Sequence, residues 1–290
     1  MTDRSERSAQ WVVGDVTITS IVESQTDHIP PAFFFPEVSE ADFAKHSWAV
    51  PDFADSDGRI GLRVQAVVVE QSGRRVLVDP CVGNGKKRAL FFWNEQSWPF
   101  MDRFVEAGFD PAGIDLVIHT HLHADHVGWD THLVDGEWVP TFSAARHLYT
   151  QAELDWCRKT DDMGMPGVYA DSIGPIFDAG LADIVDEIID LGGIRLESTP
   201  GHTPGHVSVW IESAGETALL TGDFIHHPVQ CAEPTWAEIG DDNVDLARET
   251  RRRMLDRAAS SGALVLGTHF PTRPAGHVVV DGDAWRFIPA

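Results

Sequence analysis

The segment HTHLHADHVGWD, residues 119–130, places four histidines and an aspartate within eight positions. Side chains alternate along an extended segment, so His121 and His123 point the same way and can bind one cation. A tight turn after them can bring Asp125 and His126 to a second cation. All four are nitrogen or oxygen donors, which suits zinc and also manganese, iron or cobalt. The run therefore predicts a metal site.

Four more motifs follow the order expected of one known family. They are Asp79 in LVDPC, His202 in TPGHTPGH, Asp223 in LLTGDF and His269 in LGTHFP. With the histidine run, the chain resembles the metallo-β-lactamase superfamily over nearly its whole length. A lone HxH says little, whereas five motifs in order are specific. The resemblance implies an α/β protein with a four-layer αββα sandwich.

The resemblance also implies two divalent metal ions per chain, with zinc as the first choice. Three ligands hold the first metal, three hold the second and one carboxylate bridges both. In that order they are His121, His123 and His202; Asp125, His126 and His269; and Asp223. Asp79 is expected to orient the histidine loop by hydrogen bonds. His119 opens an alternative HxH register, but only the register from His121 supplies the Asp-His pair. His119 and His206 are therefore expected to pack near the ligands.

Two metals roughly 3.5–4 Å apart can share a hydroxide at neutral pH. The expected function is a hydrolase in which this bridging hydroxide attacks an ester, and Asp125 can aim the hydroxide by a hydrogen bond. The chain shows no glycine-rich phosphate loop and no serine or cysteine nucleophile motif. The bound partner is expected to be a small-molecule substrate. A different class of function, a non-catalytic metal-dependent binding protein, remains open.

The segments VDPCVGNGKKR, HLHADHVGW and GDFIHHPVQ resemble the branch with quorum-quenching lactonases and methyl-parathion-hydrolase-like enzymes. A lactone is therefore the first substrate class, and an aryl ester or phosphotriester is the alternative. Many of these lactonases carry a tyrosine three residues after the bridging aspartate, where this chain has His226. We expect His226 either to act catalytically, as a hydrogen-bond donor or acid, or to pack in the loop with His227.

The composition limits the partners. The 290 residues include 45 acidic and 22 basic ones, a net charge of −23. Such a surface repels nucleic acid and anionic membranes, so neither is expected as a partner. The N-terminal MTDRSERSAQ lacks the apolar core of a signal peptide, which makes a cytoplasmic location the expectation. The three cysteines form no CxxC pair, so neither a disulfide framework nor a thiolate zinc site is expected.

Hydrophobic periodicity predicts layered α/β architecture around these motifs. Strands with a turn at Gly14-Asp15 are predicted at 11–22, and a hairpin that turns at Ser72-Gly73 is predicted at 63–79. Further strands are predicted at 114–118, 194–198, 206–212, 217–221 and 263–267, with a final hairpin around 281–282. Helices are predicted at 99–107, 151–158 and 243–259, and Gly262 is the predicted stop signal of the last one. Arg251 falls on the apolar face of the last helix, so its charged head is expected to reach out to water.

We expect one domain, residues 1–290, with an aromatic-rich insertion at 28–60. Residues 157–180 are also expected to be irregular. The aromatic side chains of the insertion must pack on the protein's own core, on a second subunit of a homodimer or on a substrate. Candidates for an apolar pocket are Phe33, Phe34, Phe35, Phe91, Phe92, Trp93 and Trp129.

Overall fold

The computed structural model describes residues 7–160 and 167–290. The chain divides into two compact units, each built from two separate stretches of sequence. Unit 1 contains Met1–Ser24 and Val64–Glu187, and unit 2 contains Gln25–Arg63 and Ile188–Ala290. Within the described residues, no helix is both long and apolar enough to cross a bilayer.

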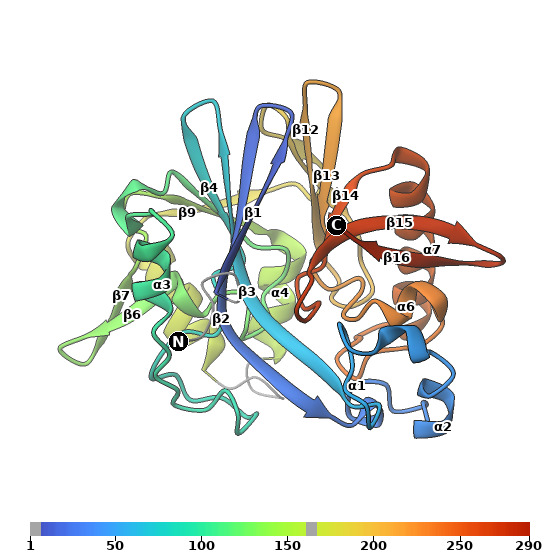
Figure 1. Cartoon of the computed structure of the whole chain (residues 1–290). Coiled ribbons are helices and arrows are strands. Elements are labelled where there is room, and N and C mark those ends of the chain that lie inside the picture. Colours follow the sequence, from blue (N-terminus) through green and yellow to red (C-terminus); the bar gives the residue numbers. More distant parts are fainter. Residues whose placement is uncertain (1–6, 161–166) are drawn as a thin grey trace. The chain divides into compact units, whose positions relative to one another are not determined.

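The first sheet has seven strands in the order β1-β2-β3-β4-β5-β8-β9 (Figure 1). Its strands are β1 (Ser8–Val13), β2 (Val16–Ile29), β3 (Ile60–Gln71), β4 (Arg74–Val78), β5 (Leu116–Ile118), β8 (Arg146–Thr150) and β9 (Ala182–Val185). From β4 to β9 the neighbouring strands are parallel. The carboxyl ends of parallel strands meet at one edge of a sheet. This edge therefore receives Asp79, just after β4, and the histidine loop, which follows β5.

Short helices and one hairpin complete unit 1. They are α3 (Phe100–Glu106), η3 (Pro111–Gly113), η4 (Gly128–Asp130), the hairpin β6 (Thr131–Val134) and β7 (Glu137–Pro140), α4 (Gln151–Thr160), η5 (Tyr169–Ile173) and α5 (Gly174–Asp178). The main core gathers aromatic side chains, with Phe100 stacked on Trp129 at 5.6 Å between ring centroids. The expectation that 157–180 is irregular is wrong at 157–160, which belong to α4, and at 169–178, where η5 and α5 are helical. Residues 161–166 of that stretch lie outside the described residues.

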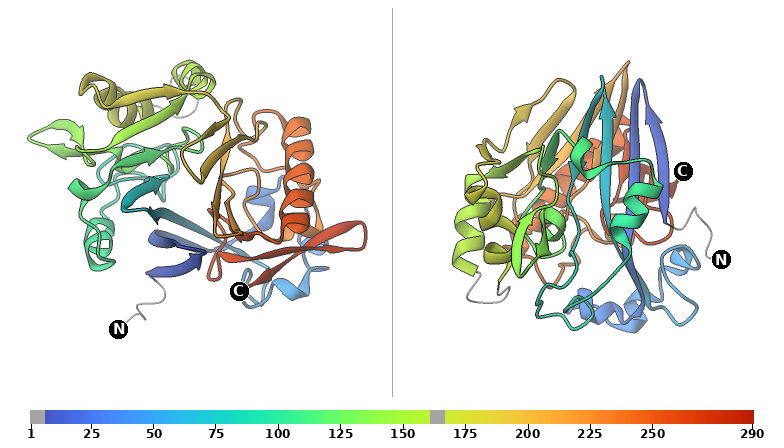
Figure 2. Two further views of the ribbon diagram at one scale, coloured as in Figure 1. Left: turned by 90° about the horizontal axis from the view of Figure 1, so that it is seen from above. Right: turned by 90° about the vertical axis from the view of Figure 1, so that its left-hand side faces the viewer.

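The second sheet lies in unit 2 and also has seven strands, in sequence order from β10 to β16. They are β10 (Ile189–Asp190), β11 (Ile194–Ser198), β12 (Val207–Ser213), β13 (Glu216–Leu220), β14 (Leu264–Leu266), β15 (Ala275–Asp281) and β16 (Ala284–Pro289). Only the pair β13 and β14 is parallel. Their connection contains α6 (Val229–Ala232) and α7 (Val244–Ser261), and α7 runs beside this sheet (Figure 2). Two mixed sheets with helices confirm the predicted α/β class.

Helix α7 starts and stops where the sequence indicates. The Asn243 side chain accepts a hydrogen bond from the Leu246 amide, and Gly262 ends the helix at φ 66°. The expectation that Arg251 reaches water is wrong, because its side chain is fully buried. The loop between β13 and α7 supplies acceptors that the sequence pattern does not reveal. The guanidinium donates hydrogen bonds to the carbonyl oxygens of Phe224, Pro234 and Trp236.

The insertion at 28–60 folds as short helical turns within unit 2. These are α1 (Pro31–Phe34), α2 (Glu40–Phe43) and η2 (Ser47–Ala49). Its aromatic side chains pack on the unit's own residues: Phe35 lies 5.8 Å from Trp236, and Phe53 lies 5.9 Å from Phe287, between ring centroids. Phe33 is the exception, with 40% of its surface exposed. Of the three expected packing partners, the protein's own core is the one that the structure shows.

Candidate metal centre

The histidine loop turns back immediately after β5. The amide of His126 donates to the carbonyl oxygen of His123 at 3.0 Å, which forms the tight turn that the sequence predicts. His121 Nε2 and His123 Nδ1 lie 2.9 Å apart. The rings of His121 and His126 are 3.9 Å apart between centroids. Unit 1 thus gathers three imidazoles into one cluster, directly after a buried strand.

Asp79 orients this loop, as predicted. Its Oδ1 accepts a hydrogen bond from the Thr120 amide at 2.8 Å, and its Oδ2 accepts one from Thr120 Oγ1 at 2.7 Å. His126 Nδ1 lies 3.0 Å from the same Oδ2. Because Thr120 Oγ1 gives its hydrogen to Asp79, it accepts from His121 Nδ1, 3.1 Å away. The proton of His121 therefore sits on Nδ1, and its Nε2 lone pair is left for a metal.

In unit 2, one carboxylate oxygen faces three imidazoles. Asp223 Oδ2 lies 3.1 Å from His269 Nε2, 3.1 Å from His226 Nε2 and 3.6 Å from His202 Nε2. The opposite ring nitrogens have their own acceptors. His269 Nδ1 donates to the carbonyl oxygen of Arg63 at 2.7 Å, and His202 Nδ1 donates to Asp241 Oδ1 at 3.1 Å. This again directs the Nε2 lone pairs toward the carboxylate that is predicted to bridge the metals.

The residues present fit divalent metal ions. Each unit carries its own donor set: unit 1 has three imidazoles and Asp125, and unit 2 has two imidazoles and the carboxylate of Asp223, the predicted bridge. Six of these seven side chains belong to buried residues, and His123 is half-buried. Within each unit, imidazoles lie close to one another or face a carboxylate, and protons alone compensate such a nearly buried cluster poorly. A cation compensates them, and nitrogen and oxygen donors of this kind suit zinc.

His206 packs against predicted ligands, as expected, whereas the described contacts of His119 are with Asp130, His147, Leu148 and Tyr149. His206 Nδ1 lies 2.7 Å from Thr199 Oγ1, and its Nε2 accepts the backbone N–H of Asp223 at 2.7 Å. It therefore fixes the backbone of Asp223, the predicted bridge. His119 Nε2 lies 2.8 Å from Asp130 Oδ2. Burial lowers the pKa of His119, but the charge and hydrogen bond of Asp130 outweigh burial and raise it.

His226 and His227 have different surroundings. His226 lies at the ligand cluster of unit 2, whereas the buried His227 donates from Nε2 to the Phe53 carbonyl oxygen at 3.0 Å. Burial lowers the pKa of His227 to about 4, so this side chain is neutral at pH 7. The packing role therefore describes His227.

Two acidic residues of this site were missed from the sequence. Glu238 Oε2 lies 3.8 Å from His202 Nδ1 and 3.9 Å from His226 Nε2, and burial raises the pKa of Glu238. Burial acts in the same direction on Asp241, but the hydrogen bond and charge of His202 lower its pKa overall. Both lie in an irregular loop, AEIGDD, whose acidic residues look like an ordinary solvated surface in sequence.

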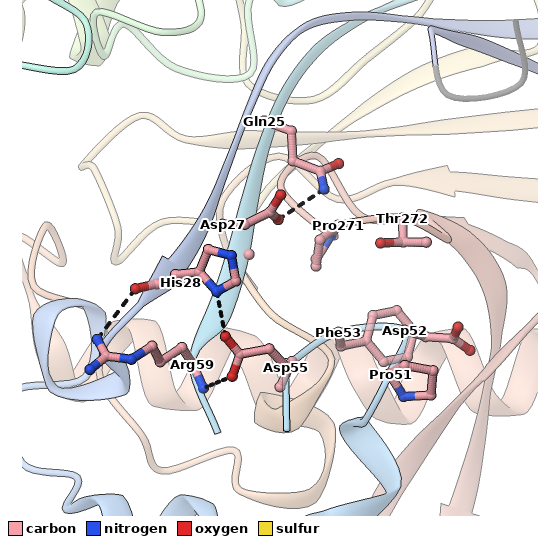
Figure 3. Close-up of a pocket in the computed structure, with 12 residues that line it drawn as sticks. Gln25, Asp27, His28, Pro51, Asp52, Phe53, Asp55, Arg59, Pro271 and Thr272 are labelled. Carbon is pink, nitrogen blue, oxygen red and sulfur yellow. Dashed lines mark hydrogen bonds and ion pairs between the residues drawn. The ribbon is translucent and has the colours of Figure 1, made fainter. Parts of the chain in front are cut away.

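A separate cavity of about 230 Å³ opens in unit 2 (Figure 3). Residues of the 28–60 insertion form much of its wall, including His28, whose Nδ1 lies 2.5 Å from Asp55 Oδ2. None of the predicted ligands lines it, although Pro271 and Thr272 follow His269 closely in sequence. The aromatic pocket candidates Phe34, Phe35 and Trp129 are instead buried in the core.

Comparison with known proteins defines the class. A family model described as the metallo-beta-lactamase superfamily matches residues 59–269. The chain therefore belongs to the metallo-β-lactamase superfamily. A solved structure titled "AidC, a Dizinc Quorum-Quenching Lactonase" superimposes with a TM-score of 0.80 at 20% identity, covering 99% of both chains. Another, of the hydrolase AbOPH, gives 0.81 at 24% identity, covering 98% of this chain and 97% of that one. These likenesses confirm the predicted metallo-β-lactamase fold.

A curated relative is the N-acyl homoserine lactonase AttM of Rhizobium radiobacter. It is 26% identical over 140 residues, 42% of this chain and 48% of the relative. The chain thus spans about half the length of the first curated relatives that it matches.

Proposed function

We propose that this protein is a dinuclear-metal hydrolase that opens the ester bond of a lactone. The observation that carries the proposal is the donor set. In both units, imidazoles are held by oxygen acceptors on Nδ1 and direct Nε2 toward other donors; these imidazoles are His121 in unit 1 and His202 and His269 in unit 2. Membership of the superfamily supports the assignment of His121, His123 and His202 to one metal and of Asp125, His126 and His269 to the other. Asp223 is the proposed bridge.

When bound, the two metal ions supply an activated water and polarise the ester carbonyl. The protein's own residues do the rest. Asp125 is proposed to orient the attacking water by a hydrogen bond. His226, with its Nε2 3.1 Å from Asp223 Oδ2, is proposed to donate a hydrogen bond or proton to the leaving oxygen.

The lactone is proposed because AttM and AidC carry lactonase in their names. An aryl ester or phosphotriester is the second candidate. The observation that favours it is His226, which stands where many of the lactonases place a tyrosine. Zinc is the proposed metal. The proposal also includes one domain, a cytoplasmic location, a homodimer and no nucleic-acid partner, each of which stays a prediction from the sequence.

The test combines metal analysis with a hydrolysis screen. Protein purified without chelator should contain close to two equivalents of metal. It should open acyl-homoserine lactones faster than it hydrolyses aryl esters, phosphotriesters, β-lactams or thioesters of similar size. His202→Ala should lower both metal content and turnover. Two bound metals without turnover of any substrate would favour the metal-dependent binding protein, and no bound metal would refute the proposal.

A further inference from the structure

His202 is held from two sides by the loop that leads into α7. The amide of Asp242 donates to the His202 carbonyl oxygen at 3.0 Å, and the amide of Asn243 donates to the Gly201 carbonyl oxygen at 2.9 Å. These bonds fix the backbone. The ring is fixed separately, because Asp241 Oδ1 lies 3.1 Å from His202 Nδ1. Both side chains are almost fully buried, at 2% and 0% exposed.

Asp241 is itself anchored by its second oxygen. Asp241 Oδ2 accepts the Glu238 amide at 3.0 Å and faces Nη2 of Arg251 at 3.4 Å. The other nitrogens of the Arg251 guanidinium donate hydrogen bonds to loop carbonyl groups, so the side chain cannot move away without breaking these bonds. The two carboxylate oxygens of Asp241 therefore have different hydrogen-bond partners. One faces two donors, and only the other faces His202.

Gly201 allows this close packing. A Cβ atom on Gly201 would lie 2.3 Å from the backbone nitrogen of Ala247 in α7, and the residue has a φ of 134°. A glycine at this position lets the His202 loop approach the first turn of α7, which follows closely after Asp241.

We propose that Asp241, anchored by Arg251, is a positioning residue that sets the tautomer of His202. As an acceptor, it keeps the proton of His202 on Nδ1 and leaves the Nε2 lone pair for a metal. The expected effect on metal affinity rests on the proposed function, because it requires that His202 binds a metal. The effect of Asp241 on the tautomer of His202 does not rest on it. It also gives the buried Arg251 a role that a solvated charge would not have.

The isosteric variant Asp241→Asn tests this sharply. The two donors that face Oδ2 require an acceptor, so the amide oxygen of Asn takes that position and the amide NH₂ faces His202. His202 Nδ1 must then accept, which moves its proton to Nε2 and blocks the lone pair. Metal affinity, measured by competition with a chromophoric chelator, should fall about 10- to 100-fold. Asp241→Ala removes the orienting group without imposing the wrong tautomer, so it should lose less affinity.

A merely structural role predicts the opposite order, because truncation to Ala disturbs packing more than Asn does. Affinity lower in Asp241→Ala than in Asp241→Asn would overturn the inference. The matched control is Glu197→Gln, which removes a carboxylate that pairs with Arg253 and Arg257 on the same helix. It should leave metal affinity unchanged.

The tautomer is read directly by ¹⁵N NMR of the imidazole nitrogens in the metal-free protein. The wild type should carry the His202 proton on Nδ1, and Asp241→Asn should carry it on Nε2. The same tautomer in both would overturn the inference even if the protein binds two metals. If the wild type binds no metal, the proposed function fails, whereas the NMR result still decides the role of Asp241.

Discussion

His226 is the residue whose role is most open to experiment. Its Nε2 faces Asp223, and its ring stacks parallel to that of His269 at 5.6 Å between centroids. We predict that His226→Phe keeps metal binding, because His226 is not a proposed ligand, but lowers kcat/KM by about 10²-fold, as expected for a lost general acid. The loss should be smaller for esters with good leaving groups, which need no protonation. Steady-state kinetics on a leaving-group series, with metal content measured alongside, checks this.

His227→Phe is the matched control for that experiment. This side chain packs against Phe43 and Phe53 and donates a hydrogen bond to a backbone carbonyl group. Its replacement should lower stability while leaving the dependence on the leaving group unchanged. A His226→Phe enzyme with wild-type rates on both good and poor leaving groups would leave His226 as a packing residue.

The residues that sequence could identify are those whose chemistry depends on short spacing. His121, His123, Asp125 and His126 lie on one loop, so their spacing alone places them together. Asp241 could not be recognised in this way, because its partner His202 lies 39 residues away and is reached through a loop with no regular pattern. The adjacent Asp242 is exposed, and in sequence nothing distinguishes the two aspartates, which hides Asp241 further.

At the scale of elements, one run of three phenylalanines in the 28–60 insertion contains both a core residue and a surface residue. Phe35 is fully buried against Trp236, whereas Phe33 is 40% exposed. We predict that Phe35→Ala lowers the free energy of unfolding by about 3–5 kcal/mol, the usual cost of a truncated core aromatic. Phe33→Ala should change it by less than about 0.5 kcal/mol. Chemical denaturation of the two variants measures both, and equal losses would mean that the insertion does not pack as described.

A buried cluster joins the loop after β4 to η5 and gives a pH prediction. Lys86 is fully buried, and its Nζ donates to Thr131 Oγ1 at 2.8 Å and to Ser172 Oγ at 3.0 Å. Burial lowers the pKa of Lys86 to about 8, although the negative charge of Asp171 and its hydrogen bond act to raise it. Between pH 8 and about 10.5 the unfolded chain binds more protons at this site, so stability rises with pH across that window.

The variant Lys86→Met isolates this effect. Relative to the variant, the wild type should gain about 2 kcal/mol in free energy of unfolding between pH 7 and pH 9.5. Urea denaturation at the two pH values measures the difference. Lys87→Met, at the exposed neighbouring position, is the matched control and should show no such change. A wild type and Lys86→Met whose difference stays constant with pH would show that Lys86 is not buried as an ammonium group.

The elements that periodicity predicted best are those with local signals. The hairpin turns at Gly14-Asp15 and Ser72-Gly73, and the stop of α7 at Gly262, all follow from residues that tolerate positive φ. The edge strand β9 and the hairpin β6–β7 carry mostly half-exposed residues, so they lack the apolar contrast on which periodicity depends. The prediction that Arg251 reaches water was wrong for a related reason. The carbonyl groups that accept its hydrogen bonds in the interior come from an irregular loop.

The whole molecule raises the question of whether its two units fold together. We predict that they do, because the boundary between the units falls inside β2 and β3, two neighbouring strands of the first sheet. Ser24 and Gln25 lie within β2, and Arg63 and Val64 lie within β3, so neither unit can unfold without breaking strands of the other. Hydrogen–deuterium exchange across a denaturant series should give peptides of β12 in unit 2 and β8 in unit 1 the same unfolding midpoint. Added zinc should raise both midpoints together, because a ligand that binds only the folded state stabilises the whole cooperative unit. Two separated midpoints, or a zinc shift confined to the peptides of one unit, would show two independent domains and contradict the single domain that the sequence predicts.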